Sequence, residues 1–97
     1  MYIFAWDDEK SAWNERQRGF SFAFASRVFS GRTLEREDLR RAYGEVRMVA
    51  VGIVDNVYLT VVFTDRIEQA GCVRRIISAR LSNRKERKAY GIGLSSR

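Results

Sequence analysis

The sequence predicts an α+β domain in which two N-terminal helices pack on a small antiparallel sheet and a further helix follows the sheet. Three observations lead to this prediction. A chain of 97 residues suffices for one hydrophobic core rather than two, so we expect a single domain over residues 1–97. Apolar residues recur at helical spacing before residue 30, and a period of two begins at Val46. Helices followed by strands are typical of an α+β fold with an antiparallel sheet.

Residues 2–5 form an apolar run that fits an edge strand, and a helix is expected directly after it. Asp7 or Asp8 supplies the N-cap, because a side-chain oxygen at that position accepts hydrogen bonds from the first backbone N–H groups. The helix is expected to end at Gly19, since glycine readily adopts the left-handed conformation that closes helices.

A second helix is expected over residues 22–29, capped by Ser21, because aromatic and alanine residues recur there on one helical face. Residues 30–45 are polar and highly charged. We interpret them as a loop with room for a short helical or extended piece.

Residues 46–65 predict a β-hairpin. Two runs rich in β-branched residues flank Asp55-Asn56, a dipeptide that tolerates the positive φ of a two-residue turn. Such a turn gathers six residues on the face that we expect to form the core: Met48, Ala50, Gly52, Leu59, Val61 and Phe63. The opposite face carries Val49, Val51, Ile53, Tyr58, Thr60 and Val62. Because this second face is also largely apolar, we expect another element or a partner protein to cover part of it.

The last third of the chain predicts one more strand and a helix. Residues 68–71 fit a turn, residues 72–79 fit a strand, and residues 82–90 fit a C-terminal helix. Ser82 or Asn83 is expected to cap that helix, because both residue types accept hydrogen bonds from backbone N–H groups.

The positive charge is concentrated in one segment. The chain carries a formal net charge of +6, and residues 69–97 contain eight basic residues but only one acidic residue. A local patch of this kind indicates a polyanionic partner, and the guanidinium groups that dominate it suit phosphate. The alternative is that these residues only keep a small protein soluble.

Strict alternation in the third strand places Arg74, Ile76, Ser78 and Arg80 on one face and Arg75, Ile77 and Ala79 on the other. The following helix adds Arg84, Lys85, Arg87 and Lys88. Because consecutive elements usually lie side by side, these charges are expected to merge into one field that attracts RNA or DNA. The arginines could equally reach solvent from the strand ends while the isoleucines fill the core.

On the first helix, Lys10, Asn14 and Arg18 are spaced by four and therefore line one face. They lie beside an apolar seam that contains Trp6 and Trp13. Either these polar residues have a functional role or their alkyl stems cover the tryptophans. We expect both tryptophans to belong to the core, although an exposed tryptophan can stack on nucleic-acid bases.

Composition excludes several functions. The chain has no histidine and a single cysteine, so it cannot build a structural zinc site or an internal disulfide, and we expect Cys72 to be a small buried hydrophobic residue. No metal and no cofactor are expected, and catalysis would have to use arginine, lysine, tyrosine or carboxylate groups. No apolar run is long enough to span a bilayer and the N-terminus does not resemble a signal peptide, so we expect a cytoplasmic protein that does not bind membranes.

Two motifs resemble those of BrnT toxins from bacterial type II toxin-antitoxin systems. The opening of that family shows Trp-Asp, Lys, Asn, Lys-His-Gly, a hydrophobic residue and Ser-Phe, and the matching residues here are Trp6, Asp7, Lys10, Asn14, Gly19, Ser21 and Phe22. The last part of the chain resembles the final strand and helix of that family. The residues that carry this second resemblance are the run RIISAR at 75–80 and Arg84, Glu86, Arg87 and Tyr90. The resemblance covers about residues 6–90. One departure is that Gln17 and Arg18 stand where the family has Lys-His.

The resemblance implies a RelE-like α+β fold and an endoribonuclease that needs no metal. It also implies a partner, a BrnA-like ribbon-helix-helix antitoxin, which neutralises the toxin and forms a hetero-oligomer with it. Operator DNA would be bound only through that antitoxin. If the family's histidine does acid–base work, another group must replace it here or the toxin is weakened.

The hypothesis that joins these observations is attack of an RNA 2′-hydroxyl on its own 3′ phosphate, which requires proton transfer and stabilisation of developing negative charge. We expect Arg75 and Arg80 to hold the phosphate and Arg18 to complete the anion clamp. Lys10 or Tyr90 would move a proton. The residues expected to bind RNA are Arg74, Ser78, Arg84, Lys85, Arg87 and Lys88. The alternatives are a non-catalytic module that only binds nucleic acid or protein, and an antitoxin interface in place of a catalytic site.

Overall fold

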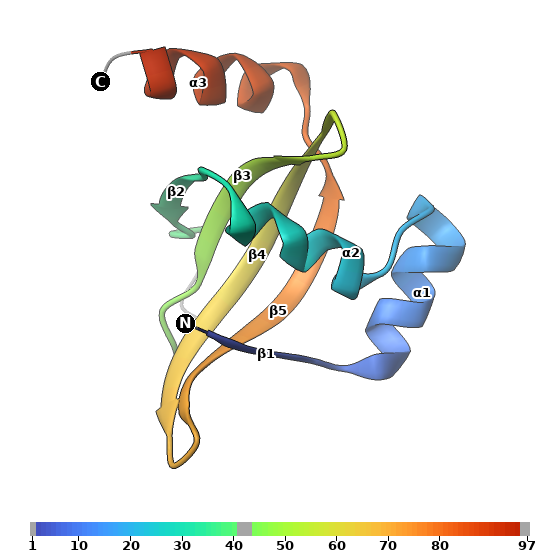
Figure 1. Ribbon diagram of the computed structural model, residues 1–97, viewed down its shortest axis with the longest axis vertical. Coiled ribbons are helices and arrows are strands. Elements are labelled where there is room, and N and C mark those ends of the chain that lie inside the picture. Colours follow the sequence, from blue (N-terminus) through green and yellow to red (C-terminus); the bar gives the residue numbers. More distant parts are fainter. Residues whose placement is uncertain (1, 41–43, 96–97) are drawn as a thin grey trace.

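The computed structural model describes residues 2–40 and 44–95. Its elements in chain order are β1 (Ile3–Trp6), α1 (Asp8–Arg18), α2 (Phe22–Ser26), the 3₁₀ helix η1 (Arg27–Ser30), β2 (Leu34–Glu37), β3 (Met48–Val54), β4 (Val57–Glu68), β5 (Gly71–Leu81) and α3 (Arg84–Ser95). The strands form one sheet in the order β1-β5-β4-β3-β2 (Figure 1), which confirms the predicted α+β class. α2 and η1 cross one face of the sheet, and α3 packs against β2 and β3 from the other face. Within the described part of the chain, no helix combines the length and the apolar character needed to cross a bilayer.

The N-terminal half follows the local signals in the sequence. Asp7 caps α1, where its Oδ1 accepts hydrogen bonds from two backbone N–H groups of the first turn at 2.9 and 3.1 Å. Gly19 ends this helix with a φ of 89°, in the left-handed region. Ser21 caps α2 as predicted, but the chain is α-helical only to Ser26 and then continues as η1.

β3 and β4 form the predicted hairpin. Asp55 and Asn56 have φ of 48° and 66°, the left-handed conformation that a two-residue turn requires. Gly52 pairs with Leu59, so the two predicted faces of the hairpin are confirmed. The face that carries Leu59 packs against α2 and η1 and forms the core.

The opposite face of the hairpin is partly covered, as expected, and the covering element is α3. Tyr90 of α3 packs edge-on against Tyr58, with ring centres 5.8 Å apart. Its hydroxyl donates a hydrogen bond to the carbonyl oxygen of Arg32 at 3.0 Å. The part of this face around Val49 and Val62 lies beyond α3 and borders a pocket.

The sheet differs from the prediction in two respects. β1 runs parallel to β5, with Ile3 beside Val73, so the sheet is mixed rather than purely antiparallel. β5 is longer than expected because β4 pairs with it from Gly71 to Leu81, and only residues 69–70 remain for the turn before it. The hairpin of β4 and β5 extends beyond the helices (Figure 1). Cys72 lies on this extension and is exposed, so the expectation that it is buried is wrong.

A bulge interrupts β5 close to its middle. Val62 of β4 pairs with Ser78, but the next residue, Phe63, pairs with Ile76. Ile77 is therefore an extra residue without a partner of its own on β4. Such a residue inverts the alternation of side chains for everything that follows it in the strand.

Because of this inversion, Arg75, which precedes the bulge, shares a face with Ser78 and Arg80, which follow it. That face is the one opposite α2. Arg74 lies on the core side of the sheet, as does Ala79 beyond the bulge. The predicted grouping of Arg74 with Ser78 and Arg80 is therefore wrong, since it assumed a strict period of two along the whole strand.

The two tryptophans differ in their environment. Trp6 is partly buried and packs against the core, as predicted. Trp13 is 47% exposed, so the expectation that it belongs to the core is wrong. The reason is that α1 buries a different face, on which the buried residues are Ser11 and Asn14. Arg18 lies over the exposed Trp13 ring, with its Cζ 5.1 Å from the ring centre.

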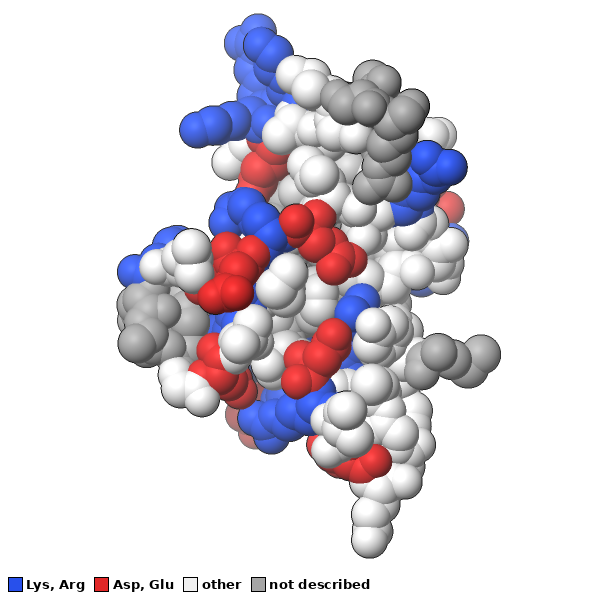
Figure 2. Space-filling model, turned by 90° about the vertical axis from the view of Figure 1, so that its left-hand side faces the viewer, with Lys and Arg blue, Asp and Glu red and all other residues white. Residues whose placement is uncertain are grey.

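Charged side chains are distributed unevenly over the surface. On the side of the molecule shown in Figure 2, acidic and basic side chains are interspersed over the middle. Hydrogen bonds from Arg66 and Arg47 to Glu45, at 3.1 and 3.2 Å, are examples of this pairing and hold the pKa of the Glu45 carboxyl below its usual value. Basic side chains gather instead at the end of the molecule where α3 lies (Figure 2).

Candidate functional site

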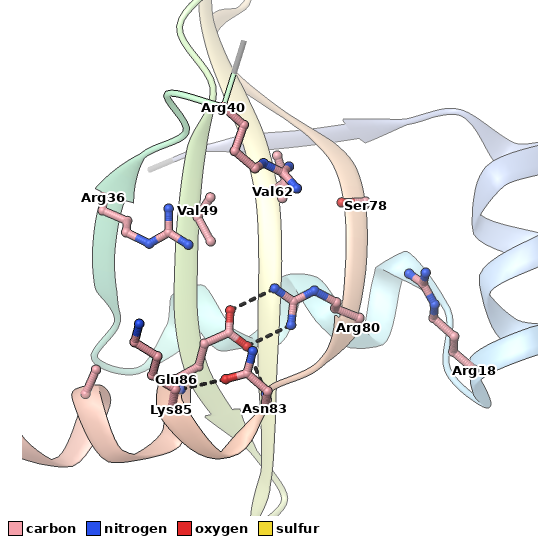
Figure 3. Close-up of a pocket in the computed structure, with 11 residues that line it drawn as sticks. Arg18, Arg36, Arg40, Val49, Val62, Ser78, Arg80, Asn83, Lys85 and Glu86 are labelled. Carbon is pink, nitrogen blue, oxygen red and sulfur yellow. Dashed lines mark hydrogen bonds and ion pairs between the residues drawn. The ribbon is translucent and has the colours of Figure 1, made fainter.

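A pocket of about 640 Å³ opens on the sheet face opposite α2, between α1, β2 and the start of α3 (Figure 3). The described residues that line it are Arg18, Arg36, Arg40, Val49, Val62, Ser78, Arg80, Asn83, Lys85, Glu86 and Ala89. Five of these residues are basic and one, Glu86, is acidic. We call this the cationic pocket. Its charge suits an anionic ligand, and the buried Val49 and Val62 give it an apolar floor.

The carboxylate in the cationic pocket is bound by an arginine. Arg80, near the end of β5, donates hydrogen bonds from Nη1 and Nη2 to the two carboxylate oxygens of Glu86, at 2.7 and 2.8 Å (Figure 3). Glu86 Oε1 also accepts a hydrogen bond from the backbone N–H of Asn83, and Asn83 Oδ1 accepts one from the backbone N–H of Glu86, both at 2.8 Å. This reciprocal arrangement is a capping box, which begins α3 and holds Glu86 in place.

The surroundings keep both members of this pair charged. The hydrogen bond from Arg80 is the largest cause that lowers the pKa of Glu86 to about 2, and the backbone N–H of Asn83 acts in the same direction against partial burial. The same bond raises the pKa of Arg80 above its ordinary value, although the nearby positive charge of Arg40 opposes it. Glu86 is therefore an anion and a poor proton acceptor while Arg80 holds it.

Two further arginines reach the cationic pocket from the side of β2. Arg40 donates hydrogen bonds from Nε and Nη2 to the carboxylate of Asp38, both at 2.8 Å. The Asp38 side chain is fully buried, whereas that of Arg40 is 73% exposed. The buried carboxylate thus orients Arg40 and leaves much of its guanidinium accessible. Arg36, on β2, extends toward the sheet beside Val49 (Figure 3).

Arg18 forms the opposite wall of the cationic pocket. Its Nη1 donates a hydrogen bond to the carbonyl oxygen of Ala79 at 2.8 Å and a longer one to Asn14 Oδ1 at 3.3 Å. Asn14 is buried and donates in turn to the carbonyl oxygen of Phe20 at 3.0 Å. These contacts hold the end of α1 against β5 and place Arg18 between the cationic pocket and a second cavity of about 270 Å³.

A comparison with known proteins shows to which family the chain belongs. A model of the family described as "ribonuclease toxin, BrnT, of type II toxin-antitoxin system" matches residues 6–86. The chain belongs to the BrnT family. The resemblance that the two sequence motifs indicated is thereby confirmed. The matched segment includes α1, β2 to β5 and the Arg80–Glu86 pair. No curated protein matches the chain significantly.

Membership of the BrnT family makes this chain a ribonuclease toxin of a type II toxin-antitoxin system. RNA is accordingly its substrate, and an antitoxin is its partner. Both conclusions agree with a pocket rich in guanidinium groups, because phosphate groups are the anions that RNA offers.

Several site residues predicted for this BrnT toxin from the sequence lie together in the structure. Arg18, Ser78, Arg80 and Lys85 line the cationic pocket. Lys10 lines the smaller cavity, to which Arg18 and Ser78 also contribute. Residues from the two ends of the chain therefore meet at one place, as the sequence hypothesis required.

Four predicted residues lie outside the lining of the cationic pocket. Arg75 is exposed on the same sheet face as Ser78. Arg84 and Lys88 are exposed on α3, and Arg87 donates a hydrogen bond from Nη1 to a carbonyl oxygen of the preceding turn at 3.0 Å. These residues can contact an RNA molecule only if the RNA extends beyond the cationic pocket.

Two predicted residues do not reach the pocket. Arg74 is buried on the core side of the sheet, where it donates two hydrogen bonds to Asp65 at 2.8 and 2.9 Å. Its guanidinium carbon also lies 3.7 to 4.6 Å from the centres of three aromatic rings. Tyr90 is 7% exposed, and its hydroxyl hydrogen is used in the bond to the carbonyl oxygen of Arg32. Both side chains therefore have structural contacts in place of the predicted roles.

Three charged residues of the cationic pocket were missed by the sequence prediction: Arg36, Arg40 and Glu86. The spacing of Asn83 and Glu86 is that of a capping box, and it could have placed Glu86 in the first turn of α3 beside the end of β5. Arg36 and Arg40 come from a polar stretch without periodicity, which carries no signal for their position.

Proposed function

We propose that this BrnT toxin cleaves RNA internally and without a metal ion, by attack of a ribose 2′-hydroxyl on the adjacent 3′ phosphate. The observation that carries the proposal is the Arg80–Glu86 pair, which lies in a pocket whose other charged residues, among those described, are all cationic. Such a pocket offers guanidinium groups to stabilise the developing negative charge and a carboxylate to accept a proton.

The scissile phosphate binds at Arg80. In the free protein, two N–H groups of the Arg80 guanidinium bind the Glu86 carboxylate. Two phosphate oxygens match the same planar guanidinium geometry. The phosphodiester therefore competes with Glu86 for Arg80. Arg18 and Arg40, from opposite walls, offset the negative charge of a phosphate placed beside Glu86.

Glu86 is the proton acceptor in this mechanism. Its pKa of about 2 is too low for this role while Arg80 holds it. When a phosphate engages Arg80, the largest cause of that low pKa is removed and the pKa rises toward its ordinary range. The carboxylate then takes the proton of the 2′-hydroxyl as the 2′ oxygen bonds to phosphorus.

The bond from phosphorus to the 5′ oxygen breaks in the same reaction and leaves a 2′,3′-cyclic phosphate and a 5′-hydroxyl end. The departing oxygen needs a proton, and we assign its donation to Lys10, which lines the adjoining cavity. Tyr90, the other residue considered for this step, uses its hydroxyl hydrogen elsewhere. Both proton transfers are thus supplied by a chain that has no histidine.

The decisive experiment is cleavage of purified RNA by the purified toxin in excess chelator. We expect shortened RNA with cyclic phosphate ends, and the same rate with and without the chelator. RNA that binds but stays intact would assign the pocket to binding alone. Loss of cleavage on chelation, restored by a divalent cation, would contradict metal independence.

Variants of the pocket test the assigned roles. Arg80→Ala and Glu86→Gln are each expected to lower the cleavage rate by about 10²- to 10³-fold, the usual effect of removing a group that stabilises charge or moves a proton in the transition state. Lys10→Ala is expected to lower it less, because water can also protonate the departing oxygen. Arg27→Ala is the matched control, since this exposed arginine pairs with Asp55 at the hairpin turn, away from the pocket. Wild-type cleavage by Arg80→Ala would refute the assignment.

The partner that we propose is a BrnA-like antitoxin with a ribbon-helix-helix domain, which neutralises the toxin in the cytoplasm and carries the complex to operator DNA. The sequence motifs that resemble BrnT toxins support this proposal. The product of the neighbouring reading frame should copurify with the toxin, inhibit cleavage, and be required for binding of operator DNA. A toxin that bound this DNA alone would contradict the last point.

A further inference from the structure

Trp13 is an exposed tryptophan beside the proposed site. It lies on α1, and 47% of its residue surface is accessible, while the buried face of the helix is formed by Ser11 and Asn14. Packing in the core therefore does not explain why a tryptophan occupies this position. The guanidinium of Arg18 lies over the ring at 5.1 Å, and Arg18 is also a wall of the cationic pocket.

Trp13 lines the second cavity, of about 270 Å³, that adjoins the cationic pocket. The described residues around it are Lys10, Trp13, Asn14, Arg18, Phe22, Ile77 and Ser78. Two of them, Phe22 and Asn14, are almost completely buried. Arg18 and Ser78 line both cavities, so the two cavities lie next to each other.

We propose that this second cavity binds a nucleobase of the RNA, stacked on Trp13, next to the phosphate held at Arg80. The inference rests on the proposed function, because it takes the cationic pocket as the place of the scissile phosphate. A nucleobase fits the observations since it is a flat, partly apolar group that the ribose links to a phosphate. The indole ring and the guanidinium that lies over it are both planar cationic or aromatic surfaces of the kind on which bases stack.

The same contacts indicate how the base is selected. Asn14 is only 1% exposed, and its amide donates to the carbonyl oxygen of Phe20 and accepts from Arg18, so we do not expect it to read a base edge. Stacking on Trp13 depends on ring area rather than on the hydrogen-bonding pattern of the base. We therefore expect the cavity to tolerate all four bases with a preference for purines, which have the larger rings.

The experiment measures binding of RNA that cannot be cleaved. The probe is a labelled decanucleotide in which every ribose carries a 2′-O-methyl group, so that no 2′-hydroxyl is present to attack. Trp13→Ala should weaken its binding about five- to 150-fold, the range that corresponds to loss of one base–aromatic stack, and Trp13→Phe should weaken it less. Ile67→Ala is the control, since this side chain is 88% exposed on the extended hairpin.

A spectroscopic measurement tests the contact directly. The chain has two tryptophans, so Trp6→Phe leaves Trp13 as the sole indole fluorophore. Its emission should be quenched when the decanucleotide binds, and a decanucleotide without bases should bind without quenching. Circular dichroism and the melting temperature show whether each variant is folded, and Trp13→Phe provides the test if Trp13→Ala is not.

The outcomes separate this inference from the proposed function. Trp13-dependent binding with quenching, in a protein that leaves ordinary RNA intact, would refute cleavage but support the nucleobase site. Cleavage of ordinary RNA together with unchanged affinity in both Trp13 variants would support the nuclease and overturn the nucleobase site. Unchanged RNA affinity with weakened binding of the antitoxin would also overturn it, because Trp13 would then be an antitoxin contact.

Discussion

The substitution Glu86→Gln should change how the stability of the protein depends on pH. Glutamine keeps the shape of the side chain but carries no charge that Arg80 can bind. Glu86 has a pKa of about 2 in the folded protein, against 4.5 for an unperturbed glutamate. Because the folded-state pKa is the lower one, the Arg80–Glu86 pair stabilises the fold at pH values above 4.5, and this stabilisation is lost as the pH falls from 4.5 to 2.

The size of the effect follows from the two pKa values and from the exposure of the pair. The difference between 4.5 and about 2 corresponds to at most about 3 kcal/mol in the free energy of unfolding. The Glu86 side chain is 13% exposed, but that of Arg80 is 43% exposed, so solvent screens the interaction. We therefore expect about 1–2 kcal/mol, within the range of hydrogen bonds to charged groups.

Urea-induced unfolding at several pH values between 7 and 2 is the appropriate assay. The variant should be about 1–2 kcal/mol less stable than the wild type at pH 7, and the two proteins should converge as the pH approaches 2. Glu15→Gln, at an exposed carboxylate of α1, is the matched control and should follow the wild type. A difference between Glu86→Gln and the wild type that stayed constant from pH 7 to pH 2 would refute the reasoning.

Three further predictions concern the fold and the RNA surface. Gly52→Ala should destabilise the protein by about 1–3 kcal/mol in urea unfolding, because the added Cβ would lie 2.8 Å from the Cβ of Val28 in η1. Asp65→Ala should cost about 1–3 kcal/mol in the same assay, since it leaves the buried guanidinium of Arg74 without its carboxylate. Arg75→Ala should bind single-stranded RNA more weakly, with a plot of log affinity against log salt that is less steep by about 0.7, the value for one lost phosphate contact.

Each of these predictions has a result that contradicts it. Wild-type stability of Gly52→Ala would mean that η1 does not press on β3. Wild-type stability of Asp65→Ala would mean that the aromatic rings alone satisfy Arg74. An unchanged salt dependence in Arg75→Ala would remove this residue from the RNA surface, and a loss of cleavage without a change in binding would place it at the scissile phosphate instead.

The parts of the fold that could be predicted are those set by local chemistry. Asp7 and Gly19 bound α1 because capping depends on residues within one turn, and Asp55-Asn56 forms the hairpin turn because few residues tolerate positive φ. A two-residue turn also fixes which residues of the two strands share a face of the hairpin. These features need no knowledge of distant residues.

The parts that could not be predicted depend on pairing between distant segments. The bulge at Ile77 depends on how β5 pairs with β4, and nothing in the strand's own residues marks it. It decides which arginines face the cationic pocket, so strict alternation assigned Arg74 to the wrong face. Trp13 was misassigned for a related reason: the packed face of α1 is fixed by its neighbours, not by the most apolar residues.

The candidate site was predictable in its charge but only partly in its members. Arg18, Arg80 and Lys85 were found because basic residues are concentrated near the C-terminus and on one face of the first helix. Arg40 was not, because its position depends on a buried carboxylate, Asp38, in a segment without periodicity.

The parallel pairing of Ile3 with Val73 has a consequence for folding during translation. A ribosome releases the chain from its N-terminus, so β1 stays without its neighbour until β5 has emerged. Arg18 must likewise wait for Arg80 and Glu86 before the pocket exists. A nascent chain that has not yet released residues 80 and 86 from the ribosome therefore lacks the pocket in which we propose that RNA is cleaved.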